Sequence, residues 1–257
     1  MSHKELSDHS PVFDFYIAGS DQIWNDGITG KTAAYYLDFV QNGKKIAWAA
    51  SLSDTVSDFQ GECFKRFLPG FSAVTLREKQ HADYIAAVSG KEISVVLDPV
   101  FLPDVQNWIA FSEKTRLKYP KKSYILVYCL GNQQSVSQEA SRKAKQLSVP
   151  VYSIHPFDHP FPGADKTLCC TGPHEFVYLI RNAACVVTDS FHATAFSVLL
   201  NTPLVTLPPQ GNAGRIHSLL EELQLSDSVQ LETGTYTVVN LEKRVEADKQ
   251  ILLAALT

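Results

Sequence analysis

Short apolar runs alternate with amphipathic stretches along most of this 257-residue chain. Residues 35–39, 45–50 and 73–76 carry the β-branched, aromatic and small side chains that are typical of buried strands. Residues 59–68 and 135–147 instead repeat their apolar positions at helical spacing. Strands that alternate with helices predict an α/β protein with parallel sheets and right-handed crossovers.

The clearest transition from strand to helix lies at residues 183–200. Residues 183–187 predict a buried strand, and the apolar positions that follow the next polar residues predict a helix. Asp189 or Ser190 is the natural N-cap of that helix, which places His192 in its first turn. Because free backbone N–H groups at a helix start favour an anion, the stretch predicts anion binding and proton transfer. The alternative is that the polar residues only cap the helix and that the histidine is structural.

Polar or charged residues also follow the other predicted strands. The carboxyl ends of strands in an open α/β sheet face one crevice, where they present groups to a ligand. Two of these residues have simpler alternatives, since Asp98 before Pro99 fits a turn and Arg77 beside Glu78 fits a surface ion pair. Besides the turn at residues 189–192, the pattern selects Ser20, Asp21, Gln22, Ser51, Arg77, Asp98, Asn132, His155 and Arg215.

Arg215 stands at an unusual position, at the start of a helix predicted over residues 216–223. The helix dipole disfavours a cation at this end. Its position therefore favours an anion within reach of the guanidinium group.

Composition narrows the class of protein. A hydrophobic content of 45% with 19% charged residues predicts a folded chain, and a net charge of −4 argues against a nucleic-acid binder. No apolar run approaches the roughly 20 residues of a membrane span, and polar residues 1–11 lack the apolar core of a secretory signal. The five cysteines show no metal-ligand spacing. We therefore expect a cytoplasmic protein with reduced thiols, no metal site and a disordered start at residues 1–11.

The order of elements predicts two α/β lobes and a terminal helix. Residues 104–122 combine basic side chains with Pro120 and are typical of a connection. The predicted domains are an N-terminal lobe at 12–118, a C-terminal lobe at 119–240 and a helix at 241–257.

Six segments in this order resemble the polysaccharide pyruvyl transferase family, and together they extend over most of the chain. The segments are FYIAGSDQIWN (15–25), AWAASLS (47–53), LREK (76–79), VLDPVFL (96–102), VTDSFHATAFS (187–197) and GRIHSLL (214–220).

The resemblance implies a fold of two Rossmann-like lobes in a glycosyltransferase-B-like arrangement. It also implies phosphoenolpyruvate as the donor substrate, no further cofactor, and a sugar on a lipid-linked or nucleotide-linked precursor as the acceptor. The expected product is a pyruvate ketal on a cell-envelope glycan or exopolysaccharide.

The resemblance also assigns expected roles to the selected residues. His192 matches the motif histidine of the family and is the candidate general acid and base, protonated mainly when the donor is bound. Asp189 orients His192 or only caps the helix. Arg77 and Arg215 are the candidates that clamp the carboxylate and phosphate of the donor. Further candidates for substrate binding are Ser190, Ser20, Asp21, Gln22, Ser51 and Asn132.

The chain departs from the family pattern at several points. Phe191 stands where many members have arginine, and Ala193 replaces a common glycine. Almost nothing precedes Phe13, whereas family members usually begin with a further βαβ unit, so the N-terminal lobe is expected to lack this unit and to expose a sheet edge. The chain is then a fragment, a short variant or a chain completed by a partner.

These departures keep two alternative functions open: a nucleotide-sugar-dependent glycosyltransferase, and a truncated, non-catalytic chain that binds sugar or acts as a scaffold. The expected partners are the donor and the sugar acceptor, together with a membrane surface or further copies of the chain. Nucleic acid is not expected.

Overall fold

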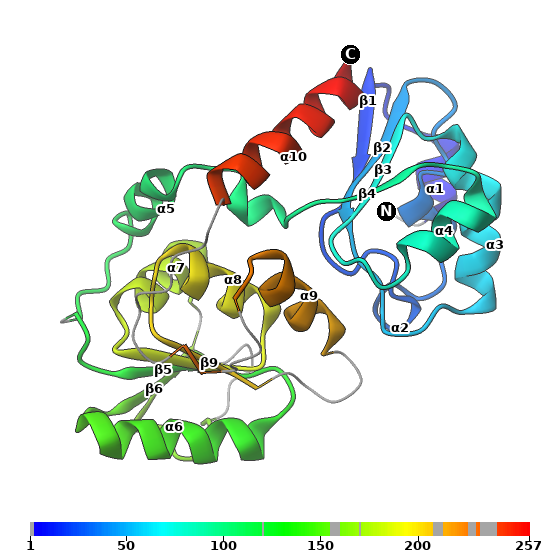
Figure 1. Ribbon diagram of the computed structural model, residues 1–257. Helices are drawn as coiled ribbons and strands as arrows, with labels where there is room; N and C mark the ends of the chain where they lie inside the picture. The colour runs from blue at the N-terminus through cyan, green and yellow to red at the C-terminus, as the bar shows by residue number, and fades with distance from the viewer. Residues whose placement is uncertain are drawn as a thin grey trace. The chain divides into compact units, whose positions relative to one another are not determined.

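The computed structural model of the chain divides into two compact units, and each is built on its own β-sheet (Figure 1). Unit 1 comprises Met1–Leu102 and Asn240–Thr257, and unit 2 comprises Pro103–Val239. The structure describes residues 3–119, 121–154, 160–169, 171–207, 213–225, 230–231 and 241–257. His155, which the sequence pattern selected, lies outside the described residues.

Unit 1 contains a parallel sheet of four strands in the order β1-β2-β3-β4. Its strands are β1 Phe15–Ala18, β2 Lys44–Ala50, β3 Ala73–Leu76 and β4 Ile93–Val95. Its α-helices are α1 His3–Asp8, α2 Asp26–Thr29, α3 Asp58–Phe67, α4 Ala82–Ser89 and α10 Leu241–Leu256, and its 3-10 helices are η1 Ala33–Tyr36, η2 Leu68–Gly70 and η3 Pro99–Phe101.

An aromatic cluster forms much of the core on one face of this sheet. Trp24 is fully buried and stacks on Tyr36 with ring centroids 5.5 Å apart, while Phe64 from α3 meets both rings edge-on. A capping box fixes the start of α3: Ser57 Oγ accepts from the Gln60 N–H at 3.2 Å, and Gln60 Oε1 accepts from the Ser57 N–H at 2.6 Å. Aromatic burial and the cap together hold the helix against the sheet.

The terminal helix α10 covers part of the opposite face. Ile251 and Leu252 pack against a buried cluster that contains Trp48 of β2 and Val96. A helix on each face is the usual way in which a parallel sheet buries both of its surfaces.

The same helix also closes the β4 edge of the sheet. The Val96 N–H donates to the Leu76 carbonyl at 2.9 Å, so Val95 and Leu97 turn their backbone groups away from β3. Arg244 donates to the Val95 carbonyl at 2.6 Å, and Asp248 accepts from the Leu97 N–H at 2.9 Å. Two side chains of α10 thus bind backbone groups that a further strand would otherwise bind.

Unit 2 contains a sheet of six strands in the order β10-β9-β8-β5-β6-β7, with β10 antiparallel to β9 and the other pairs parallel. Its strands are β5 Ile125–Tyr128, β6 Val151–Ile154, β7 Lys166–Leu168, β8 Cys185–Thr188, β9 Leu204–Thr206 and β10 Gln230–Leu231. Its helices are α5 Val105–Ser112, α6 Gln133–Leu147, α7 Pro173–Asn182, α8 Phe191–Leu199 and α9 Gly214–Glu222. Among the described helices of the whole chain, none is long and apolar enough to cross a membrane.

Two local predictions are wrong. Within residues 1–11, predicted as disordered, His3–Asp8 forms the helix α1, and His3 pairs with Asp38 at 2.9 Å. Residues 35–39, predicted as a strand, belong instead to η1 and the loop after it. The backbone of Leu37, with φ at 51°, ends any extended run there.

The division between the units falls after Leu102, ahead of the predicted boundary at residues 118 and 119. Helix α5, within the predicted connection, packs on α7, and Trp108 of α5 meets Phe196 of α8 edge-on at 4.9 Å. Helix α10, predicted as a separate terminal element, groups with unit 1. Unit 1 is therefore made from two separate parts of the chain.

Candidate functional site

In the turn after β1, the backbone of Gly19 lies very close to the backbone of Trp48 in β2. Gly19 has φ at 127°, and a Cβ at this position would lie 2.0 Å from the Trp48 carbonyl oxygen. Only glycine fits such an approach. The backbone therefore places Ser20 and Asp21 at the carboxyl edge of the unit 1 sheet.

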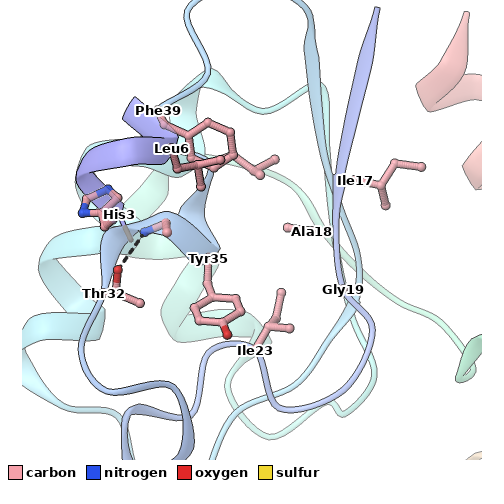
Figure 2. Close-up of a pocket in the computed structure, with 11 residues that line it drawn as sticks. His3, Leu6, Ile17, Ala18, Gly19, Ile23, Thr32, Tyr35 and Phe39 are labelled. Carbon is pink, nitrogen blue, oxygen red and sulfur yellow. Dashed lines mark hydrogen bonds between the residues drawn. The ribbon is translucent and has the colours of Figure 1, made fainter. Parts of the chain in front are cut away.

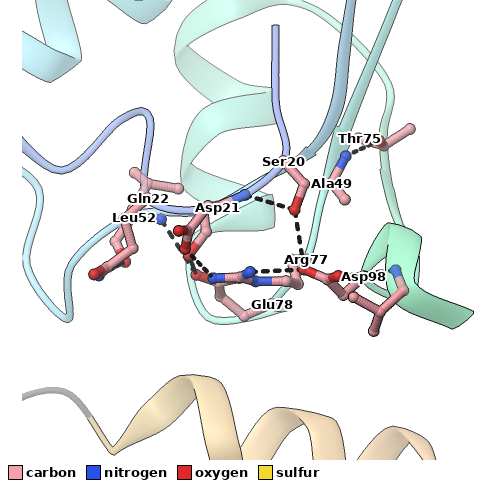
Figure 3. Close-up of polar contacts among 11 residues, drawn as sticks. Ser20, Asp21, Gln22, Ala49, Leu52, Thr75, Arg77, Glu78 and Asp98 are labelled. Carbon is pink, nitrogen blue, oxygen red and sulfur yellow. Dashed lines mark hydrogen bonds and ion pairs between the residues drawn. The ribbon is translucent and has the colours of Figure 1, made fainter. Parts of the chain in front are cut away.

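A buried arginine organises this edge (Figure 3). Arg77, which follows β3, donates to Asp98 at 2.7 Å and to Asp21 at 3.3 Å. Its Nε lies 3.7 Å from a carboxylate oxygen of Glu78, and the Ser20 hydroxyl donates to Asp98 at 3.0 Å. These contacts join the residues that follow β1, β3 and β4 into one cluster.

The charge balance of this cluster bears on the predicted role of Arg77. Its side chain is 2% exposed and faces three carboxylates, so the cluster carries net negative charge. To bind an anionic donor, Arg77 would have to break its ion pair with Asp98, whose side chain is also 2% exposed. In this structure the contacts of Arg77 hold the turns after β1, β3 and β4 together. Asp21, whose side chain is 61% exposed, is the member of the cluster that faces solvent most.

Ser51 and Gln22, predicted to bind substrate, are buried as well. The Ser51 hydroxyl donates to Glu78, which also accepts from the Leu52 N–H at 3.2 Å. The Gln22 amide donates to the Leu52 carbonyl at 3.3 Å. Their side chains fix the turn after β2 and offer almost no surface to a ligand.

A cavity of about 540 Å³ lies beside the end of β1 (Figure 2). Its lining is mainly apolar and includes Leu6 of α1, Ala18 of β1, Gly19 in the turn after β1, and Tyr35 with Phe39. It therefore lies next to the turn that carries Ser20 and Asp21.

In unit 2, the predicted strand-to-helix transition is present as β8 and α8. Ser190 is the N-cap of α8, with its Oγ accepting from the Ala193 N–H at 3.4 Å. The Ser190 carbonyl in turn accepts from the Thr194 hydroxyl at 2.9 Å. His192 lies in the first turn as predicted, half-buried, with its ring edge-on to Phe191 at 5.4 Å.

Asp189 has a role that the sequence did not indicate. Its carboxylate accepts from the backbone N–H groups of Leu130, Gly131 and Asn132, each at 2.7 Å. Asn132 is the N-cap residue of α6, so the buried carboxylate occupies the place where a bound anion would meet this helix start. Burial and the Asp189 charge raise the pKa of the neighbouring Cys129 thiol to about 12. Asp189 is thus a positioning residue for the turn between β5 and α6.

Three predicted residues of unit 2 share one edge of the sheet. Asn132, His192 and Arg215 follow β5, β8 and β9, which are neighbouring strands. Chain order reverses between β5 and β8, because β6 and β7 lie on one side and β9 on the other. Such a switch point is the usual ligand crevice of an open α/β sheet. Helices α8 and α9 pack together, so His192 and Arg215 lie in the first turns of adjacent helices.

Among the described residues, no group of three or more His, Cys, Asp or Glu side chains is placed to hold a metal ion. The groups available for chemistry at the unit 2 edge are an imidazole, a guanidinium and helix N-termini. This set suits an anionic ligand and proton transfer better than it suits metal coordination.

Comparisons with known proteins agree with this architecture. UDP-GlcNAc 2-epimerase from Neisseria meningitidis, solved bound to UDP-GlcNAc, has a TM-score of 0.54 at 13% identity, over 97% of this chain and 78% of that one. UDP-GlcNAc 2-epimerase from Methanocaldococcus jannaschii has a TM-score of 0.51 at 13% identity, over 97% and 79%. The corresponding enzyme from Rickettsia bellii has a TM-score of 0.51 at 15% identity, over 98% and 75%. No curated protein gives a significant match.

The chain has an α/β fold of the glycosyltransferase-B-like type, as predicted. A family model described as polysaccharide pyruvyl transferase matches residues 2–211. The chain therefore belongs to the polysaccharide pyruvyl transferase family, a family of transferases.

Proposed function

We propose that this chain transfers pyruvate from phosphoenolpyruvate to two hydroxyl groups of one sugar in a glycan precursor, forming a ketal. In this reaction both hydroxyl oxygens bond to the enol carbon, and the bond from that carbon to the phosphate oxygen breaks. One hydroxyl proton ends on the methylene carbon, which becomes a methyl group, and the other leaves with inorganic phosphate. The chemistry needs a proton donor and acceptor and a site for an anion.

Support for a donor site comes from the carboxyl edge of unit 2. His192 lies within the family-matched residues, in the first turn of a helix capped by Ser190, at the switch point of the sheet. Arg215 opens the adjacent helix. A donor with carboxylate and phosphate groups gains from helix N-termini and from a guanidinium, and His192 is placed in this edge to exchange protons. The position of His192 is the observation on which this assignment depends most.

Support for an acceptor site comes from unit 1. The net negative cluster around Arg77 disfavours an anionic donor there, while the exposed Asp21 carboxylate can accept hydrogen bonds from sugar hydroxyls. The mainly apolar cavity beside Gly19 suits the less polar part of an acceptor. This edge of unit 1 therefore has groups that can bind hydroxyl groups of a sugar.

Thermal unfolding with and without phosphoenolpyruvate tests the donor assignment. A ligand that binds only the folded protein raises the temperature midpoint of unfolding. At a ligand concentration of a hundred times its Kd, the free energy of unfolding increases by about 2.7 kcal/mol. We expect Arg215→Ala to raise the Kd for phosphoenolpyruvate about tenfold or more, because a charge-assisted contact is lost. The shift of the unfolding midpoint at a given ligand concentration should become smaller accordingly. His192→Ala is expected to keep most of the binding and to lose turnover, measured as phosphate release with a sugar acceptor.

Arg142→Ala is the matched control, because Arg142 lies on α6 and pairs with Glu139 at 2.7 Å on the exposed surface. It should leave the donor response unchanged. If phosphoenolpyruvate gives no shift and a uridine diphosphate sugar does, the chain is a nucleotide-sugar enzyme instead. If neither gives a shift, the non-catalytic alternative replaces the proposal.

A further inference from the structure

Five cationic side chains fall within nine residues of unit 2, in the segment between α5 and β5 (Figure 1). Among the described residues, no carboxylate forms an ion pair with any of them, and all five side chains are exposed. A run of like charges is usually balanced by acidic neighbours, and this one is not. We call this group the basic strip, and its members are Lys114, Arg116, Lys118, Lys121 and Lys122.

Two carboxylates lie near the strip, and both are bound elsewhere. Glu113 pairs with Arg181 of α7 at 2.5 Å, so its charge is already neutralised. Glu175 accepts from the Thr115 hydroxyl at 3.0 Å and from the Gly172 N–H at 3.1 Å. One negative charge, that of Glu175, therefore stands against the five positive charges of the strip.

The backbone of the segment is fixed along the length of α7. Thr115 is bound to the first turn of this helix, as described above. The Tyr119 N–H donates to the Tyr178 hydroxyl at 3.1 Å, and the same hydroxyl donates to the Tyr119 carbonyl at 3.2 Å. The Lys122 N–H donates to the carbonyl of Asn182, the last residue of α7, at 2.7 Å. The strip is therefore mounted on a rigid element.

Exposed and covered side chains alternate in the first part of the segment. Lys114, Arg116 and Lys118 are exposed, whereas Thr115 is buried and Leu117 is half-buried between them. The inner residues pack on the unit, so the three cations share the outer side of the segment.

The strip extends from the candidate donor edge of unit 2 to the opposite edge. Helix α7 begins after β7, at the carboxyl edge of the sheet, and ends before β8, at the amino edge. Because Thr115 is bound to the start of α7 and Lys122 to its end, Arg116 lies toward the carboxyl edge. A surface that binds the strip therefore passes beside the edge that carries His192.

Lys166, the first residue of β7, adds a sixth cation next to the strip. Its ammonium group donates to the Tyr119 hydroxyl at 2.8 Å and lies 5.0 Å and 5.8 Å from the ring centroids of Tyr119 and Tyr152. Both rings are half-buried. Tyrosine rings with a polar tip are typical of surfaces at the level of lipid headgroups.

We propose that the basic strip binds the surface of an anionic membrane. The ammonium and guanidinium groups then lie at the level of the negatively charged headgroups, and the half-buried tyrosines face the same layer. Each Lys or Arg near an anionic lipid surface strengthens binding about fivefold, so six cations on one side of a unit give measurable attachment.

The composition of the strip favours a lipid surface over a soluble anion. Four of its five residues are lysine, whose flexible ammonium group carries charge without the fixed geometry of a guanidinium. Arginine predominates where one phosphate or carboxylate is bound by paired hydrogen bonds. The whole chain carries a net charge of −4, which repels a long polyanion that reaches past the strip. A lipid surface meets only the side that faces it, because salt screens charges beyond about 10 Å.

Sedimentation of the intact chain with lipid vesicles tests the proposal. The vesicles contain phosphatidylcholine alone or with about one third phosphatidylglycerol. We expect the parent chain to sediment with the anionic vesicles at about 0.05 M salt, to be released at about 0.5 M salt, and to ignore the neutral vesicles. The triple variant Lys114→Gln/Arg116→Gln/Lys118→Gln should bind the anionic vesicles about a hundredfold more weakly, since three factors of about five are lost.

A matched control separates the strip from net charge. The triple variant Lys65→Gln/Arg66→Gln/Lys79→Gln removes the same charge from exposed positions of unit 1. It should bind the anionic vesicles as well as the parent does. The unfolding midpoint of both variants checks that each keeps its fold, because exposed substitutions usually change stability little.

Lysine acetylation of the parent chain, read by mass spectrometry, locates the contact without any substitution. Anionic vesicles should protect Lys118, Lys121 and Lys122 from an amine-reactive reagent. Lys65 and Lys79 should stay as reactive as they are without vesicles.

The proposal is overturned if the parent stays in the supernatant with anionic vesicles at low salt, or if both triple variants lose binding to the same extent. If vesicles leave the strip reactive and heparin protects it, the strip binds a soluble polyanion and the membrane proposal is wrong. None of these outcomes depends on phosphoenolpyruvate binding, so they are separate from the test of the proposed function.

Discussion

Both units bury a charged side chain at the end of a parallel strand, yet they neutralise it with opposite partners. In unit 1 the guanidinium of Arg77 is met by carboxylates of Asp21, Glu78 and Asp98. In unit 2 the carboxylate of Asp189 is met by three backbone N–H groups of the turn between β5 and α6. The arrangement in unit 1 depends on side chains that follow three different strands. The arrangement in unit 2 depends on the backbone of one turn.

The difference explains how similar strand edges acquire different chemistry. The side-chain network leaves net negative charge at the unit 1 edge, which suits hydroxyl donors. In unit 2 a built-in carboxylate occupies the α6 helix start, and the first turns of α8 and α9 carry His192 and Arg215 instead. The Asp189 carboxylate therefore takes up backbone N–H groups that a bound anion could otherwise use.

The largest expected effect is that of Arg77→Met. This change leaves the buried carboxylate of Asp98 without its cation, and breaking such a pair costs about 3–5 kcal/mol. Hydrogen exchange followed by mass spectrometry should show faster exchange in β2 and β3 and unchanged exchange in β5 and β8. The double variant Arg77→Met/Asp98→Leu should regain part of the stability, because the lone charge is removed. If the single variant is as stable as the parent, the cluster is not structural.

Asp189→Asn should have a smaller effect, confined to unit 2. The amide keeps the size of the side chain but offers one acceptor oxygen to three N–H groups. Hydrogen bonds to a charged acceptor contribute about 1.5–3 kcal/mol, so we expect a loss in that range. Exchange should accelerate at residues 130–133 and in β5, with unit 1 unchanged. Faster exchange in both units would mean that the two sites are not independent.

The smallest effect concerns Glu175 in the first turn of α7, whose carboxylate accepts from the N–H of the N-cap residue Gly172 at 3.1 Å. Hydrogen bonds from its own N–H, from the Thr115 hydroxyl and from the Gly172 N–H lower the pKa of this carboxyl. Because the folded-state pKa is depressed, this stabilisation is present above the ordinary value of 4.5 and is lost as pH falls through the lower folded value.

Glu175→Gln should therefore lower stability by about 1 kcal/mol or less at neutral pH. The difference in the free energy of unfolding between the variant and the parent should disappear in acid. Urea unfolding at a series of pH values measures this difference. A difference in the free energy of unfolding that stays constant with pH would show that the charge of Glu175 does not contribute to the cap.

The local patterns predicted most of the scaffold because they depend on neighbouring residues. The strand at residues 73–76, the Ser190 cap and the position of His192 all follow from periodicity and capping within one segment. The family was likewise predicted from motifs in order. Helix α1 was missed, because residues 3–8 are polar and carry no apolar period.

The roles of the charged residues could not be predicted in the same way. Asp189 binds a turn 57 to 59 residues away, and Arg77 binds residues 21 and 56 positions away. A sequence shows that such residues end strands but not which partner neutralises them. The glycine and asparagine at 131 and 132 were the available signal, since they mark a turn with exposed N–H groups. The functional roles of the site residues stay predictions, for catalysis by His192 and Asp189 as for substrate binding by Arg77, Arg215, Ser190, Ser20, Asp21, Gln22, Ser51 and Asn132.

The return of α10 to unit 1 has a consequence for synthesis on the ribosome. Unit 2 is one continuous segment and can form as soon as residue 239 has emerged, whereas the β4 edge of unit 1 waits for Arg244 and Asp248. During that interval the β4 edge of the nascent unit 1 sheet lacks its final partner. Translation pauses before residue 240 should therefore prolong a state prone to aggregation, and the last helix acts as the closing step of folding.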